Sequence, residues 1–87
     1  MIMRGYYHIY AKTTCEYCKL AIDLLKERGE KFVVTVMDNC QEYEDGAKQM
    51  YAHPTVPIVL KLIPKEGGPS AELIGGYTEL ERLLSNE

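Results

Sequence analysis

The chain has 87 residues, of which 46% are hydrophobic and 26% are charged, and its net charge is -3. This composition is ordinary for a globular protein, and the length suits one hydrophobic core, so we expect a single domain over residues 1–87. The acidic balance argues against nucleic acid or an anionic membrane as a partner. No apolar run has the length of a signal peptide or a membrane span, so we expect neither.

The pattern of apolar side chains and of glycine and proline breaks predicts the element order βαβαββα. The expected strands cover residues 4–10, 31–37, 56–63 and 71–74, and the expected helices cover residues 15–28, 41–51 and 78–84. A whole helix separates the first two strands, so they should be parallel, whereas a turn over residues 64–69 should join the last two as a hairpin. We therefore expect an α/β fold with a mixed four-stranded sheet that helices cover on both faces.

The first expected helix begins at two cysteines, in the segment Cys15-Glu16-Tyr17-Cys18. Free backbone N–H groups and the positive end of the helix dipole favour an anion there, so a thiolate at Cys15 is stabilised. Three residues make nearly one helical turn, which places Cys18 beneath Cys15 on the same face. A nucleophilic thiolate with a second thiol in reach is the minimum apparatus for thiol–disulfide exchange.

A zinc site is the alternative use of these two cysteines. The remaining candidate ligands are Cys40, His8 and His53, which form neither a second CxxC pair nor a histidine pair. We therefore expect no metal, and we assign no catalytic role to either histidine. Cys40 is expected to be an inert thiol near a helix start, with a regulatory thiol or a site of glutathionylation as the alternatives. An odd number of cysteines without an export signal also argues against structural disulfides and for a reducing, cytoplasmic setting.

Three motifs together resemble the glutaredoxin family. They are the AKTTCEYC segment of residues 11–18, the TVP segment of residues 55–57 and the IGGYTEL segment of residues 74–80. The resemblance implies a thioredoxin-like fold and glutathione-dependent reduction of protein disulfides and glutathionylated thiols. The chain has no tryptophan, so it lacks the WCGPC segment of ordinary thioredoxins.

The resemblance implies roles for the residues around the two thiols. Cys15 is expected to be the nucleophile and Cys18 the thiol that resolves its mixed disulfide. Lys12 is expected to bind the glycine carboxylate of glutathione, and Tyr17 to flank the glutathione groove. Glu16 stands where the family usually has proline: its carboxylate opposes ionisation of Cys15, and the backbone N–H gained with it favours ionisation.

The TVP segment, Thr55, Val56 and Pro57, is expected to form one edge of the same groove. The proline of this motif is cis in the family, which turns the Val56 N–H and C=O outward. An extended peptide that carries a cysteine can then pair with them as an added strand.

The glycine pair is expected to form the other edge of the groove, with Gly76, Tyr77 and Thr78 as its binding residues. Glycines permit a close backbone approach, and the helix start that follows can hold the α-carboxylate of the γ-glutamyl group. Thr78 can also act as the N-cap of that helix. Glu79 stands where relatives often carry aspartate and is a weaker candidate.

The expected function is that of a glutathione-dependent oxidoreductase, monomeric, with ribonucleotide reductase as one protein partner on family analogy. Two alternatives remain open. The first is a thioredoxin-like carrier that a flavoprotein reductase reduces. The second is a module in which Cys15 and glutathione hold an iron–sulfur cluster across a dimer.

Overall fold

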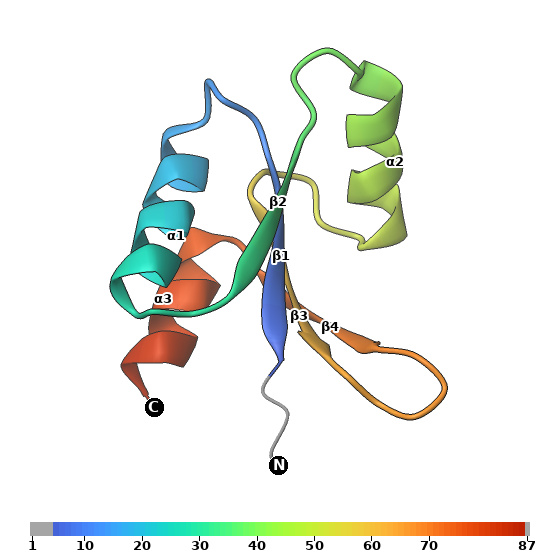
Figure 1. Ribbon diagram of the computed structural model, residues 1–87. Coiled ribbons are helices and arrows are strands. Elements are labelled where there is room, and N and C mark those ends of the chain that lie inside the picture. The colour runs from blue at the N-terminus through green and yellow to red at the C-terminus, as the bar shows by residue number, and fades with distance from the viewer. Residues whose placement is uncertain (1–4, 87) are drawn as a thin grey trace.

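The computed structural model describes residues 5–86 and contains four strands and three helices (Figure 1). Their bounds are β1 (Tyr6–Ala11), α1 (Glu16–Glu27), β2 (Phe32–Val36), α2 (Gln41–Met50), β3 (Ile58–Ile63), β4 (Ser70–Gly75) and α3 (Tyr77–Ser85). The predicted order βαβαββα is confirmed, and β3 begins two residues later than expected. Arg4, which the prediction placed in the first strand, lies outside the described residues.

The sheet has the strand order β2-β1-β3-β4, so β1 and β3 are central. β1 pairs in parallel with β2, and Ile9 lies opposite Val34. β1 and β4 both pair with β3 in the antiparallel sense. The sheet is therefore mixed, as predicted, because a helix connects the parallel pair and a turn connects the last antiparallel pair.

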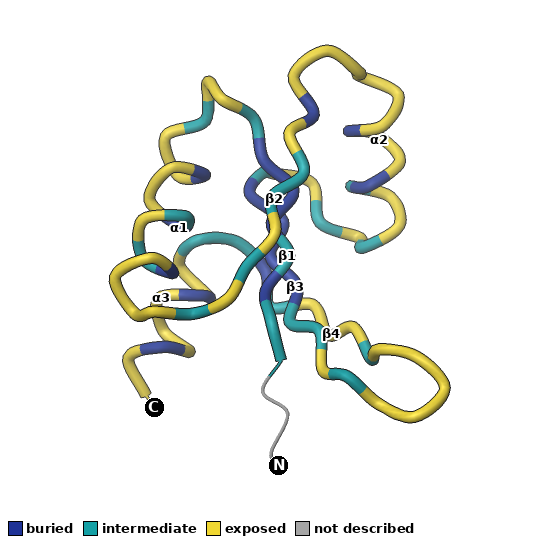
Figure 2. The backbone as a smooth tube through the Cα atoms, viewed as in Figure 1, coloured by how far each residue is buried: buried dark blue, intermediate teal, exposed yellow. Residues whose placement is uncertain are grey.

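Helices α1 and α3 cover one face of this sheet and α2 covers the other (Figure 1). Side chains alternate between the faces along each strand. Burial is deepest along β1 and β3 and on the helix faces turned toward them (Figure 2). The buried cluster under α1 and α3 consists of Tyr7, Ile9, Ala11, Cys18, Ala21, Leu25, Val59, Leu80 and Leu84. The cluster under α2 consists of Tyr10, Met37, Ala47, Ile58 and Leu60.

Strand direction brings three loops to one edge of the sheet. Tyr10, near the end of β1, pairs with Ile58 at the start of β3. Val59 in turn pairs with Gly75, where β4 ends. The segments that follow β1, precede β3 and follow β4 therefore meet at the same edge. Among residues 5–86, no helix has the length and apolar character needed to cross a membrane.

Candidate active site

Cys15 is the N-cap of α1, and its sulfur completes the first turn of that helix. Its Sγ accepts a hydrogen bond from the Cys18 backbone N–H at 3.1 Å. The same sulfur lies 3.8 Å from the carbonyl oxygen of Val56, in the loop before β3. The amide donor and the helix N-terminus both place positive partial charge beside the sulfur. Cys15 is partly exposed, so a substrate sulfur can reach it.

Cys18 lies in the first turn of α1 in a different environment. Its side chain packs in the core and is 1% exposed. Burial, followed by the hydrogen-bonding interaction with Cys15, raises the pKa of the Cys18 thiol to about 12. At neutral pH Cys18 is therefore a protonated thiol beside a more accessible sulfur, and the two cysteines are chemically distinct.

Asp38 holds the loop that leads into Cys15. This residue follows β2, and its carboxylate accepts a hydrogen bond from the Thr13 backbone N–H at 2.8 Å and another from the Thr13 hydroxyl. These hydrogen bonds lower the pKa of Asp38, because they stabilise the ionised carboxylate. The Cys15 backbone N–H also donates a hydrogen bond to the Lys12 carbonyl oxygen at 3.1 Å, which closes a turn in this loop. The position of Cys15 thus depends on β2 as well as on its own helix.

A groove of about 170 Å³ lies between α1, the loop before β3 and the start of α3, and its lining reaches the thiols through Val56, which contacts Cys15, and Tyr17, which precedes Cys18. Its lining residues are Tyr17, His53, Thr55, Val56, Pro57, Gly76, Tyr77, Thr78 and Glu79. Seven of the eight residues expected to bind glutathione are therefore brought together in one groove. The eighth, Lys12, does not line it. Its ammonium instead forms an ion pair with Glu44 of α2, with Nζ and Oε1 3.1 Å apart.

Two tyrosines and a proline turn shape the groove. The rings of Tyr17 and Tyr77 lie 6.1 Å apart in a tilted arrangement, and Tyr17 is 60% exposed. The Val56-Pro57 peptide bond is cis, as the resemblance implied. The rings give this groove a flat apolar side next to polar backbone.

The start of α3 corrects one expectation. The helix begins at Tyr77 with Gly76 as its N-cap, so Thr78 lies inside the first turn and is not the cap. The backbone N–H of the N-cap residue Gly76 instead donates a hydrogen bond to Oε1 of Glu79 at 2.8 Å. Gly75 has φ of +126°, and a Cβ there would lie 2.7 Å from the same Oε1. The glycine pair thus makes room for the Glu79 carboxylate.

Both histidines have partners that the sequence did not reveal. His53 lines the groove, and its Nδ1 lies 2.8 Å from the Thr55 carbonyl oxygen, so Nδ1 carries the proton and donates. Its position two residues before the TVP segment was the available signal for this contact. His8 Nε2 lies 2.7 Å from the Thr35 hydroxyl, and burial lowers the His8 pKa. Neither imidazole contacts a cysteine in the described hydrogen bonds.

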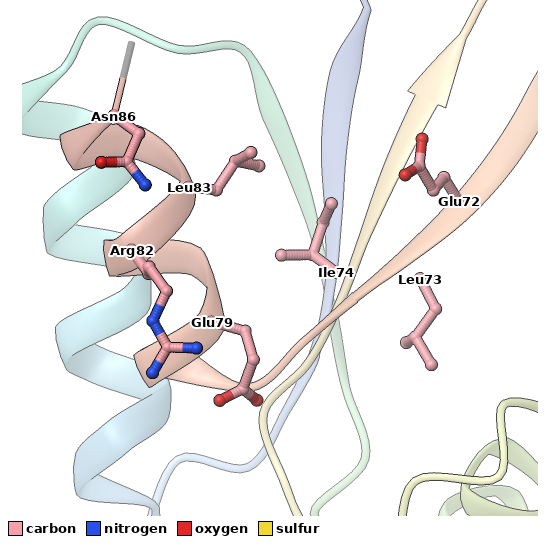
Figure 3. Close-up of a pocket in the computed structure, with 7 residues that line it drawn as sticks. All are labelled: Glu72, Leu73, Ile74, Glu79, Arg82, Leu83 and Asn86. Carbon is pink, nitrogen blue, oxygen red and sulfur yellow. The ribbon is translucent and has the colours of Figure 1, made fainter.

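Other candidate sites lie away from the thiols. A cavity of about 330 Å³ between β4 and α3 is lined by Ile74, Glu79, Arg82 and Leu83 among others (Figure 3), and it shares only Glu79 with the groove. Cys40 is exposed at the start of α2 and makes no capping hydrogen bond through its side chain. Within residues 5–86, no group of three His, Cys, Asp or Glu side chains is placed to hold a metal ion.

The family comparison matches the part of the chain that carries the thiols. The family model Glutaredoxin matches residues 8–61, which is more than half of the chain and includes both cysteines and the TVP segment. The chain belongs to the glutaredoxin family. Membership makes a thiol–disulfide oxidoreductase function the expected one for this glutaredoxin, in a family that uses glutathione as reductant. A comparison with curated proteins finds no match.

Proposed function

We propose that this glutaredoxin uses glutathione to reduce protein disulfides and glutathionylated thiols, with Cys15 as the nucleophile and Cys18 as the resolving thiol. The observation that carries the proposal is the asymmetry of the two cysteines. Cys15 is accessible and accepts an amide hydrogen bond, whereas Cys18 is buried and protonated directly beneath it. A nucleophilic cysteine must be accessible to the substrate, whereas a resolving cysteine can stay buried and protonated until the mixed disulfide forms.

With a glutathionylated protein, the Cys15 thiolate attacks the sulfur of the glutathione moiety. A Cys15–glutathione disulfide forms, and the protein thiolate leaves and takes a proton from water. Free glutathione then attacks the glutathione sulfur of this mixed disulfide. Glutathione disulfide leaves, and the Cys15 thiolate is restored.

With a protein disulfide, the Cys15 thiolate attacks one substrate sulfur, the substrate S–S bond breaks, and the second substrate sulfur leaves as a thiolate. Cys18 gives its proton to that thiolate and attacks Cys15 Sγ. The mixed disulfide breaks, the first substrate sulfur leaves as a thiolate and takes a proton from water, and a Cys15–Cys18 disulfide and a reduced protein result. Two glutathione molecules then reduce this disulfide and leave as glutathione disulfide. The short distance between the Cys15 sulfur and the Cys18 backbone supports this second step, because it keeps both residues in one helical turn.

The groove supplies the expected contacts for glutathione. Thr55, Val56 and Pro57 offer a strand-like edge to the backbone of the bound tripeptide. The first turn of α3 offers the N–H groups of Tyr77 and Thr78 to the γ-glutamyl carboxylate, since the Gly76 N–H already donates to Glu79.

The remaining residues of the proposed glutathione site lie at the rim of the groove. Tyr17 and Tyr77 cover the middle of the tripeptide, and Lys12 binds its glycine carboxylate from outside the groove. Acting as a monomer in the cytoplasm, such a protein could supply electrons to ribonucleotide reductase, a partner we propose on family analogy.

The test compares wild type with Cys15→Ser, Cys18→Ser and, as a matched control, Cys40→Ser. Turnover is measured with glutathione and a glutathione reductase couple, once on a glutathionylated peptide and once on a protein disulfide. Cys15→Ser should lose both activities, and Cys18→Ser should keep the first and lose most of the second. Cys40→Ser should match wild type on both substrates.

Three outcomes would reject parts of this proposal. Equal loss of both activities in Cys18→Ser would reject the assigned roles. Reduction by a flavoprotein reductase without glutathione-dependent turnover would identify a thioredoxin-like carrier instead. Visible absorbance of the freshly purified protein would point to the iron–sulfur module.

A further inference from the structure

Glu44 is a buried charge on α2 that the thiol chemistry does not use. It is 5% exposed and is the one charged residue among residues 5–86 that is buried. Its Oε2 accepts a hydrogen bond from Lys48 Nζ at 2.7 Å, and its Oε1 lies 3.1 Å from Lys12 Nζ. Lys48 and then Lys12 lower the pKa of Glu44, so the carboxylate is ionised at neutral pH.

The two lysines hold this carboxylate in different ways. Lys48 lies one helical turn from Glu44 on α2, and its contact is both an ion pair and a hydrogen bond. Lys12 belongs to the loop before Cys15, and Oε1 of Glu44 receives no well-aligned hydrogen bond. The Lys48 contact is therefore built into the helix, whereas the Lys12 contact joins two separate segments and is the easier one to break.

We propose that Glu44 is a specificity-determining residue that competes with the glutathione carboxylate for Lys12, and that Lys48 sets the strength of this competition. The inference rests on the proposed function, in which Lys12 binds the glycine carboxylate. One carboxylate between two lysines leaves one net positive charge in the cluster. Lys12 can turn toward a ligand because Lys48 still neutralises Glu44, and a bare buried carboxylate is avoided.

The arrangement predicts opposite effects for two charge-removing variants. Glu44→Gln removes the competitor and frees Lys12, so the KM for a glutathionylated peptide should fall. Lys48→Gln leaves Glu44 with Lys12 as its one partner, so the same KM should rise. The lysine of each ion pair is partly exposed, so we expect the KM to change by about two- to fivefold.

The experiment measures kcat and KM for a glutathionylated peptide at about 0.15 M salt, where distant surface charges are largely screened. Glu42→Gln is the matched control for the lost carboxylate, since Glu42 is exposed on the same helix. Lys26→Gln, at an exposed position near the end of α1, is the control for the lost lysine. Both controls should keep the wild-type KM.

A second substrate separates competition for Lys12 from a general structural role. Each variant is reduced and then reacted, without glutathione, with bis(2-hydroxyethyl) disulfide, which has no carboxylate. The ratio of the rate on the glutathionylated peptide to the rate on this uncharged disulfide should rise in Glu44→Gln and fall in Lys48→Gln. A structural disturbance would change both rates by the same factor and leave the ratio unchanged.

Shifts of the KM and of this ratio in opposite directions for the two variants support the inference. Shifts in the same direction, or values equal to those of the controls, overturn it while leaving the proposed function intact. Should Glu44→Gln fail to fold, Lys48→Gln decides by itself, because Lys48 is partly exposed. A wild-type protein that does not act on the glutathionylated peptide would overturn the proposed function, and this inference with it.

Discussion

Replacing Cys18 with serine should remove one cause of the fall in the free energy of unfolding that we expect at alkaline pH. The folded protein keeps the Cys18 thiol protonated, because burial raises its pKa from 9.0 to about 12. The unfolded chain has no such burial, so its thiol ionises near pH 9. Between these values the unfolded state binds fewer protons than the folded state, and the free energy of unfolding must fall as the pH rises.

The size of this loss follows from the two pKa values. At pH 10 the full shift corresponds to a loss of about 1.4 kcal/mol relative to neutral pH. If solvent screening halves the pKa shift of Cys18, the loss of unfolding free energy at pH 10 is still about 1.2 kcal/mol, because most of it comes from ionisation of the unfolded chain. Serine does not ionise in this range, so Cys18→Ser should lack this contribution even if its stability at pH 7 is lower.

Urea unfolding at pH 7, 8, 9 and 10, in the presence of a phosphine reductant, measures this contribution. Far-ultraviolet circular dichroism follows the transition, since the chain has no tryptophan. Cys40→Ser is the matched control, because it removes an exposed thiol and should keep the wild-type decline. Parallel curves for wild type and Cys18→Ser would refute the reasoning, since Cys18 would then ionise equally in both states.

Two further predictions concern the loops that frame the groove. Gly75→Ala should destabilise the fold by more than about 1 kcal/mol, because alanine is strained at φ of +126° and its Cβ would contact Glu79. In urea unfolding, the double variant with Glu79→Ala should lose less than the sum of the single losses, and simple additivity would contradict the contact. Asp38→Asn should lower the urea midpoint at pH 7, since it weakens the hydrogen bonds from Thr13. The lowered pKa of Asp38 means that its contribution is lost as pH falls below about 4, so the difference from wild type should shrink at pH 3, and a constant difference would argue against an ionised partner.

The sequence predicted most of the candidate site because most of it consists of short contiguous motifs. The TVP segment and the glycine pair each keep their groove residues together in the chain, and strand pairing then brings them to one edge of the sheet. Lys12 was harder to place, since it lies in a loop and its partner Glu44 lies 32 residues further along the chain, on α2. The cap of α3 was also misjudged, because the Glu79 side chain reaches back to Gly76, and Thr78 was the better-known capping type.

By itself, the amino-acid sequence determined the order of the strands and helices and the position of the two thiols at a helix start. These features depend on residues close together in the chain: apolar side chains at helical or strand spacing, glycine breaks, and a CxxC pair spaced by nearly one turn. Tertiary structure alone decided how each group behaves once folded. Packing of Cys18 in the core between α1 and the sheet keeps its thiol protonated, and α2 brings Glu44 to Lys12. Burial and ion pairing depend on which distant segments become neighbours, and no local pattern in the chain specifies that.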